Sequence, residues 1–192
     1  MCFHFKQSKS EEFFRARGLR GHPVNGVYNG FSHPSINVVT QESPKEIKHF
    51  MWGLIPSWAK NDDIKKYTLN ARHETLKTKP SFKNAKRCLI FSDGFYEWKW
   101  LDKHGINKKK YLIELPNSEL FSFAGLYDQW VDKKTGEIIN SCSIITTEAK
   151  GIMREIHNSK IRMPLIIENN KMEDWLENRE INLFYNFKTS EV

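Results

Sequence analysis

The sequence has few cysteines and no motif built from them. Its three cysteines, at positions 2, 88 and 142, form no CxxC pair. An odd number without close spacing argues against a disulfide framework or a zinc site and fits a reducing cytosol. Six histidines also lack metal-like spacing with one another, so we expect no metal. These are His4, His22, His33, His49, His73 and His104.

Long apolar runs and cofactor motifs are missing as well. No stretch is long and apolar enough to span a bilayer, and residues 1–20 contain no signal-peptide core. The chain has no GxGxxG, GxxxxGK[ST], HExxH or GxSxG pattern. We therefore expect a soluble cytoplasmic protein with no cofactor and no membrane partner.

What the sequence does contain is aromatic and β-forming material. Thirteen Phe, six Trp and six Tyr in 192 residues can supply the core of one domain. Strand patterns dominate, helical stretches are short, and their alternation is irregular. This favours an α+β fold, a single compact domain with a curled, mostly antiparallel sheet and short flanking helices. We expect a core at about residues 2–178 and a mobile tail at about 179–192.

Local patterns predict where these elements lie. We expect a helix from Glu11 to Arg17 capped by Ser10, and a second helix that opens at Asn70 and continues to Lys77. Residues 22–34 look like a loop. Two more helices are expected at about 148–156 and 172–176. The predicted strands are 36–40, 48–54, 88–91, 95–100, 111–115, 120–126, 138–146 and 165–167.

Positive charge is unevenly distributed along the chain. The net charge is +7, and residues 60–87 hold nine Lys or Arg against three acids. From residue 168 to the end the balance reverses, with six acids and three bases. A concentrated basic segment favours a polyanion partner such as nucleic acid, although solvated lysines alone are an equal explanation.

The first two residues carry the most specific chemistry. A side chain as small as that of Cys2 normally permits removal of Met1, which leaves an α-amine and a thiol on one residue. Their ordinary pKa values, about 8 and about 8.5, keep both reactive forms accessible near neutral pH. The amine adds to an aldehyde to give an imine, and the thiol then closes a thiazolidine ring. The alternative is a frayed terminus without a chemical role.

Other candidate residues have structural alternatives of their own. Trp52 and Trp58 flank a stiff Gly- and Pro-containing loop, where they either fill the core or form a stacking surface for bases. Asn70 is either a helix cap or a site residue. Glu97 lies on a strand rich in aromatic residues, so it is either partly desolvated and suited to proton transfer or an exposed glutamate.

The chain contains Cys2 followed, in order, by WGLIPSW, NARHET, SDGFYEW, FAGLYDQW and HNSKIRMP, which end near residue 167. In this order, these motifs resemble those of the SRAP family, the SOS-response-associated peptidases. Family members shield abasic sites in single-stranded DNA, have a compact barrel-like sheet and contain a positive groove. The resemblance therefore implies a partner, single-stranded DNA with abasic sites, and a monomer.

The resemblance also implies roles for individual residues. Cys2 would join the opened sugar after autocatalytic loss of Met1, and Asn70 would hold the Cys2 amine or the sugar. Glu97 would move protons, and His157 would position or protonate the sugar. Arg72 and Arg162 would grip phosphates, and Trp98 would line the DNA cleft.

Some features of this sequence depart from the family. Members commonly begin Cys-Gly-Arg, whereas here Phe3 and His4 follow Cys2. Four residues separate His157 from Arg162, a longer spacer than in some relatives.

Three hypotheses remain from the sequence. The first is an abasic-site crosslinking enzyme with autopeptidase activity and a lyase side reaction. The second is a noncatalytic reader of single-stranded or modified DNA. The third is an amidohydrolase with Cys2 as an N-terminal nucleophile.

Overall fold

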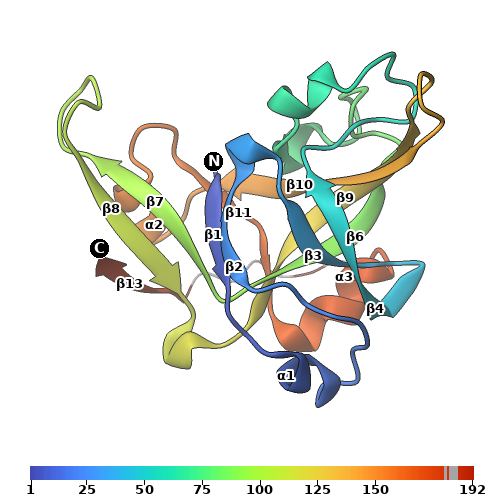
Figure 1. The fold of residues 1–192 in the computed structure, drawn as a ribbon. Helices are drawn as coiled ribbons and strands as arrows, with labels where there is room; N and C mark the ends of the chain where they lie inside the picture. The colour runs from blue at the N-terminus through green and yellow to red at the C-terminus, as the bar shows by residue number, and fades with distance from the viewer. Residues whose placement is uncertain (180, 182–185) are drawn as a thin grey trace.

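Five strands close into a barrel at the centre of the molecule (Figure 1). In this computed structural model, which describes residues 1–179, 181 and 186–192, the barrel order is β10, β4, β3, β6 and β9. All neighbours are antiparallel except β10 and β4, which are parallel. The barrel strands are β3 (Ser35–Thr40), β4 (Ser43–Trp52), β6 (Lys86–Ser92), β9 (Phe121–Val131) and β10 (Ile138–Glu148).

Three short strands extend the barrel. They are β5 (Asn70–Arg72), which runs parallel to β10, and β11 (Arg162–Pro164) and β12 (Ile166–Ile167), which pair with β10 and β9. A second, antiparallel sheet has the order β13, β8, β7, β1, β2. Its strands are β1 (His4–Gln7), β2 (Gly26–Asn29), β7 (Gly94–Trp100), β8 (Lys108–Glu114) and β13 (Lys188–Glu191).

The helices are short. The α-helices are α1 (Glu11–Arg15), α2 (Ile152–Ile156) and α3 (Met172–Leu176). The 3₁₀ segments are η1 (Gly30–Ser32), η2 (Asp63–Tyr67), η3 (His73–Thr75), η4 (Pro116–Ser118) and η5 (Asn169–Lys171). Ser10 caps α1 by accepting a hydrogen bond from the Phe13 amide, as expected. Among the described residues, no helix is long and apolar enough to cross a membrane.

The predicted fold class is confirmed: one compact domain with a curled, mostly antiparallel sheet and short helices. Two local predictions are wrong. Asn70 does not open a helix, because residues 70–72 pair with β10 as a strand. The expected loop at 22–34 contains β2, which pairs with β1. Part of the expected mobile tail forms β13 on the edge of β8, while positions 180 and 182–185 lie outside the described residues.

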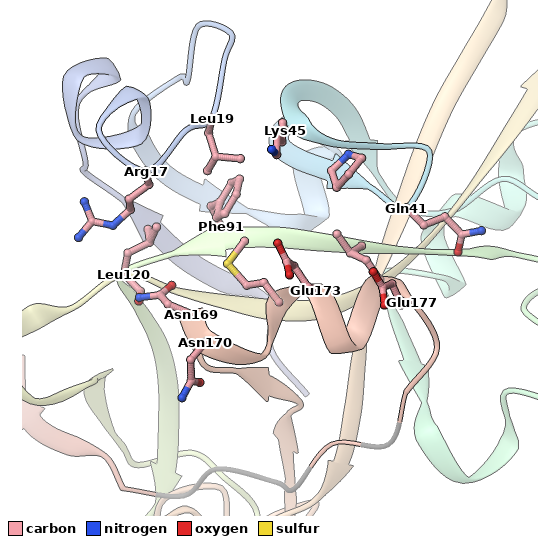
Figure 2. Close-up of a pocket in the computed structure, with 13 residues that line it drawn as sticks. Arg17, Leu19, Gln41, Lys45, Phe91, Leu120, Asn169, Asn170, Glu173 and Glu177 are labelled. Atoms are coloured by element: carbon pink, nitrogen blue, oxygen red, sulfur yellow. The ribbon is translucent and has the colours of Figure 1, made fainter.

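A pocket of about 680 Å³ lies between α3, β6 and the segments after α1 and β3 (Figure 2). Phe91 and Leu120 contribute apolar side chains, and Arg17, Lys45, Glu173 and Glu177 contribute charged ones. None of the site residues predicted from the sequence lines this pocket. The candidate site must therefore be found elsewhere, at the start of β1.

Candidate active site

The start of the chain, strand β7 and the end of α2 meet at one buried point. The Met1 amine lies 2.7 Å from Nε2 of His157 and 3.8 Å from Oε1 of Glu97. Nε2 of His157 in turn lies 3.6 Å from Oε2 of Glu97. β1 is placed between β2 and β7 by antiparallel pairing, which brings the start of the chain beside Glu97.

Cys2 is fully buried next to this cluster, and Asn70 holds its backbone. Nδ2 of Asn70 donates a hydrogen bond of 2.9 Å to the Cys2 carbonyl oxygen. We expected Asn70 to contact the Cys2 amine or the sugar. In the structure it contacts the Cys2 carbonyl oxygen. Within the described part of the chain, Oδ1 of Asn70 is buried without a hydrogen-bond partner. That oxygen remains an acceptor available beside Cys2.

His157 is held as a neutral ring with a defined tautomer. Its Nδ1 accepts a hydrogen bond of 3.1 Å from the Arg162 backbone amide, so the neutral ring carries its proton on Nε2. Burial, together with nearby positive charge, lowers the pKa of His157 to about 3. Near neutral pH, Nε2–H therefore points at the terminal amine.

Glu97 takes the opposite protonation state to an ordinary glutamate. It faces inward on β7 and is 4% exposed, which excludes the exposed alternative. Burial raises the pKa of Glu97 to about 8, and the nearby amine only partly offsets this. Its Oε1 has no hydrogen-bond partner among the described residues. Near neutral pH, the carboxyl group is mostly protonated and can act as an acid.

The amine and the thiol are also shifted towards their neutral forms. Burial lowers the pKa of the Met1 amine, an effect larger than the opposing attraction of Glu97. Burial and the Glu97 charge raise the pKa of the Cys2 thiol well above its usual range. A neutral amine is nucleophilic, whereas a neutral thiol needs a base to take its proton.

The two predicted phosphate-binding arginines differ in their surroundings. Arg72 is exposed at the end of β5. Arg162 is bound bidentately to Glu74, with Nη–Oε distances of 2.8 and 3.0 Å, and it also donates to the Thr146 carbonyl. Its charge contributes to the lowered pKa of His157, so Arg162 acts on the site electrostatically while Glu74 holds it.

The tryptophans separate into surface and core residues. Trp58 is 55% exposed, and Trp98 is half-buried with its ring 5.0 Å from that of His4. The ring of Trp52 is fully buried, and its Nε1 donates to the Leu69 carbonyl. No face of this ring is open to a base, so Trp52 is a core residue and the prediction that it binds DNA is wrong.

Several residues at the site were missed from the sequence. Phe31 is 62% exposed and lies 4.8 Å from the ring of Phe3 and 6.3 Å from that of His4, measured between centroids. The Asn158 side chain accepts a hydrogen bond from the Trp100 amide and donates one to the Trp100 carbonyl oxygen. Glu74 lies within the NARHET motif and Asn158 directly follows His157 in HNSKIRMP. Their positions in these motifs could have marked both as site residues.

Comparisons with known proteins show which family the chain is similar to. The family model for SOS response associated peptidase (SRAP) matches residues 1–185. The abasic site processing protein YoqW of Bacillus subtilis (strain 168) is 41% identical over 159 residues, which cover 77% of this chain and 68% of that protein. The abasic site processing protein HMCES of Gallus gallus is 33% identical over 165 residues, covering 72% of this chain and 47% of that protein.

The same fold occurs in a solved structure. A crystal structure of a protein from Bacteroides thetaiotaomicron superposes with a TM-score of 0.88 at 33% identity, covering 100% of this chain and 92% of that one. The resemblance found in the motifs thus extends over the whole architecture. The chain belongs to the SRAP family.

Proposed function

We propose that this protein captures abasic sites in single-stranded DNA as a covalent thiazolidine adduct of Cys2, after autocatalytic removal of Met1. The observation that carries the proposal is the convergence of the terminal amine, His157 and Glu97 within 3.8 Å of one another beside a buried Cys2. The relatives YoqW and HMCES are abasic site processing proteins, which supports the choice of substrate.

The site supplies the groups that such a capture needs. Protonated Glu97 donates a proton to the sugar ring oxygen, and the bond between that oxygen and the anomeric carbon breaks. The anomeric hydroxyl returns its proton to the Glu97 carboxylate, which leaves the open aldehyde. The Cys2 amine, in its neutral form, attacks the aldehyde carbon. Glu97 protonates the departing hydroxyl, and loss of one water gives an iminium, which is the protonated imine. The thiol sulfur then adds to the iminium carbon as the thiol proton passes to the Glu97 carboxylate, and the nitrogen keeps its own proton in the ring. Nε2–H of His157 stays a donor that can position the opened sugar. Aldehyde and aminothiol thus become a thiazolidine and water.

Two further features fit the same reaction. The unpartnered Oδ1 of Asn70 can accept a hydrogen bond from the Cys2 amine that Met1 removal exposes. Exposed Arg72 and Trp58 and half-buried Trp98 can contact the strand that leads to the sugar. An imine that escapes ring closure can promote β-elimination, which is the expected lyase side reaction.

The test is a denaturing gel of processed protein mixed with single-stranded DNA that carries one abasic site. We expect a covalent band that Cys2→Ala abolishes and that Cys88→Ala, a buried cysteine elsewhere, leaves unchanged. Glu97→Gln should slow band formation about 10²-fold or more, because it removes the acid, whereas Glu119→Gln on the surface should not. A band that survives Cys2→Ala would refute the proposal. DNA binding without any band would favour the noncatalytic reader.

A further inference from the structure

The β7–β8 hairpin carries a concentration of lysines that its own acids do not neutralise. Residues 99–110 hold five lysines against one acid, Asp102. Lys99 and Lys109 are directly opposite each other in the strand register, an arrangement that costs stability for like charges. Lys109 pairs with Glu191 on β13 at 3.0 Å. The Asp102 carboxylate accepts from backbone amides of the turn, including those of His104 and Asn107.

Lys108 and Lys110 lie opposite Trp100 and Trp98 in the strand register and point away from the buried face of the hairpin. Side chains of β7 alternate, so Glu97 faces the site while Tyr96, Trp98 and Trp100 face outward. Nζ of Lys110 lies 4.2 Å from the Tyr96 ring centroid, and Nζ of Lys108 lies 5.2 Å from that of Trp100. These cation–π contacts hold two ammonium groups along the outward face. The rings are covered by lysines, so this face suits phosphates better than stacked bases.

The hairpin is hydrogen-bonded to the loop that follows His157 in the candidate active site. It projects from the body of the molecule (Figure 1). Asp102 accepts hydrogen bonds in its turn, and a Cβ at Gly105 would lie 2.6 Å from the Trp100 ring, so the turn needs glycine there. Asn158, the residue after His157, accepts from the Trp100 amide at 3.0 Å and donates to the Trp100 carbonyl at 2.8 Å. A groove of about 430 Å³ separates the hairpin from the loop after His157, and Lys103 and Ser159 line it.

We propose that the β7–β8 hairpin is a second DNA contact, which binds the phosphodiester backbone of the strand flanking the trapped sugar without reading its sequence. The occupant is single-stranded DNA, because Lys103, Lys108 and Lys110 are complementary in charge to its phosphates. The hydrogen bonds of Asn158 to Trp100 connect the hairpin to the candidate active site. The inference rests on the proposed function for the location of the reacting sugar. It extends the binding surface beyond the residues that touch that sugar.

The test measures reversible binding in a Cys2→Ala background, so the outcome does not depend on covalent capture. The hairpin variant combines Lys103→Gln, Lys108→Gln and Lys110→Gln. The matched variant makes the same charge change at three exposed lysines of the other basic segment, with Lys77→Gln, Lys79→Gln and Lys83→Gln. Each is titrated with a short strand that fills only the cleft and with a long strand, over a range of salt concentrations. Melting temperatures confirm that both variants are folded.

We expect the hairpin variant to lower the salt dependence of long-strand binding by about 2 in the log–log slope, since each lost single-strand phosphate contact removes about 0.7. Binding of the short strand should be unchanged. An unchanged slope in the folded hairpin variant would overturn the inference, and would be the result if the exposed Leu101 and Ile106 at the tip served a protein partner instead. An equal loss for short and long strands, or the loss appearing only in the matched variant, would overturn it too.

Discussion

His157 and Glu97 lie 3.6 Å apart, yet their pKa values move in opposite directions from the ordinary ones. Both shifts have the same first cause, because burial disfavours a charged imidazole and a charged carboxylate alike. An attraction between a charged pair would shift both values the other way. The site therefore keeps a protonated carboxyl group and a neutral imidazole side by side, so Glu97 can give and take back a proton while His157 offers Nε2–H as a donor.

The neutral state of His157 should appear in the pH dependence of stability. Its folded pKa of about 3 lies below the ordinary 6.5, so below pH 6.5 the unfolded chain binds a proton that the folded chain does not. The free energy of unfolding should fall as the pH drops from about 6.5 towards 3, by up to about 1.4 kcal/mol per pH unit from this residue. Urea titrations of the protein and of His157→Gln at several pH values measure the difference.

His104→Gln, at an exposed position in the hairpin turn, is the control and should keep the pH dependence of the unsubstituted protein. Histidine ring NMR gives a direct measurement that does not need a folded variant. A His157 resonance that titrates near pH 6.5 would show that the ring is charged in mildly acidic solution and is not held neutral by burial.

At the scale of elements, the barrel tolerates little added volume where β6, β9 and β10 meet. A Cβ on Gly125 of β9 would lie 2.7 Å from Sγ of Cys88 and 3.3 Å from the Ser143 carbonyl oxygen. Gly125→Ala should therefore lower the free energy of unfolding by about 1–3 kcal/mol, because neighbouring strands must move apart. The midpoint of a urea unfolding curve measures this.

Gly26→Ala in β2 is the control for Gly125→Ala, because it also replaces a glycine within a strand. Its nearest heavy atoms are 3.8 Å away on the Tyr28 ring, which is ordinary contact, so stability should be unchanged or slightly higher. If both substitutions lower the free energy of unfolding equally, then loss of a glycine in a strand, and not crowding inside the barrel, causes the destabilisation.

The elements that could be predicted are those whose own residues specify them. The strand predicted at 95–100 is found as β7, and Glu97, for which desolvation was one of two alternatives, is buried on it. β5 could not be predicted, since Asn70 pairs with Ile144 of β10 and nothing near Asn70 encodes that partner. The local pattern there favours a helix cap, and a distant strand overrides it. β2 was missed for the same reason, because it is defined by pairing with β1 across an intervening helix.

At the scale of the whole molecule, the candidate site exists only when distant parts of the chain are assembled. The Cys2 carbonyl contacts Asn70, and the terminal amine contacts His157 and Glu97. No spacing in the sequence links these positions, so composition and periodicity could not bring them together. Their order in the family motifs supplied the grouping, while burial and the resulting pKa shifts became visible only with the fold.

Because of this assembly, residues added before Met1 should disturb the candidate site, whereas residues added after Val192 should not. The Met1 amine already lies 2.7 Å from Nε2 of His157, so an uncleaved tag before Met1 must pass through the space that we assign to the sugar. Val192 is 60% exposed beyond β13, and a tag there meets no buried group. We expect the N-terminally tagged protein to form no covalent band and to melt at a lower temperature, while the C-terminally tagged protein matches the untagged one. Equal crosslinking by both tagged forms, with the N-terminal tag shown intact by mass, would mean that a free amine on Cys2 is not the group that reacts.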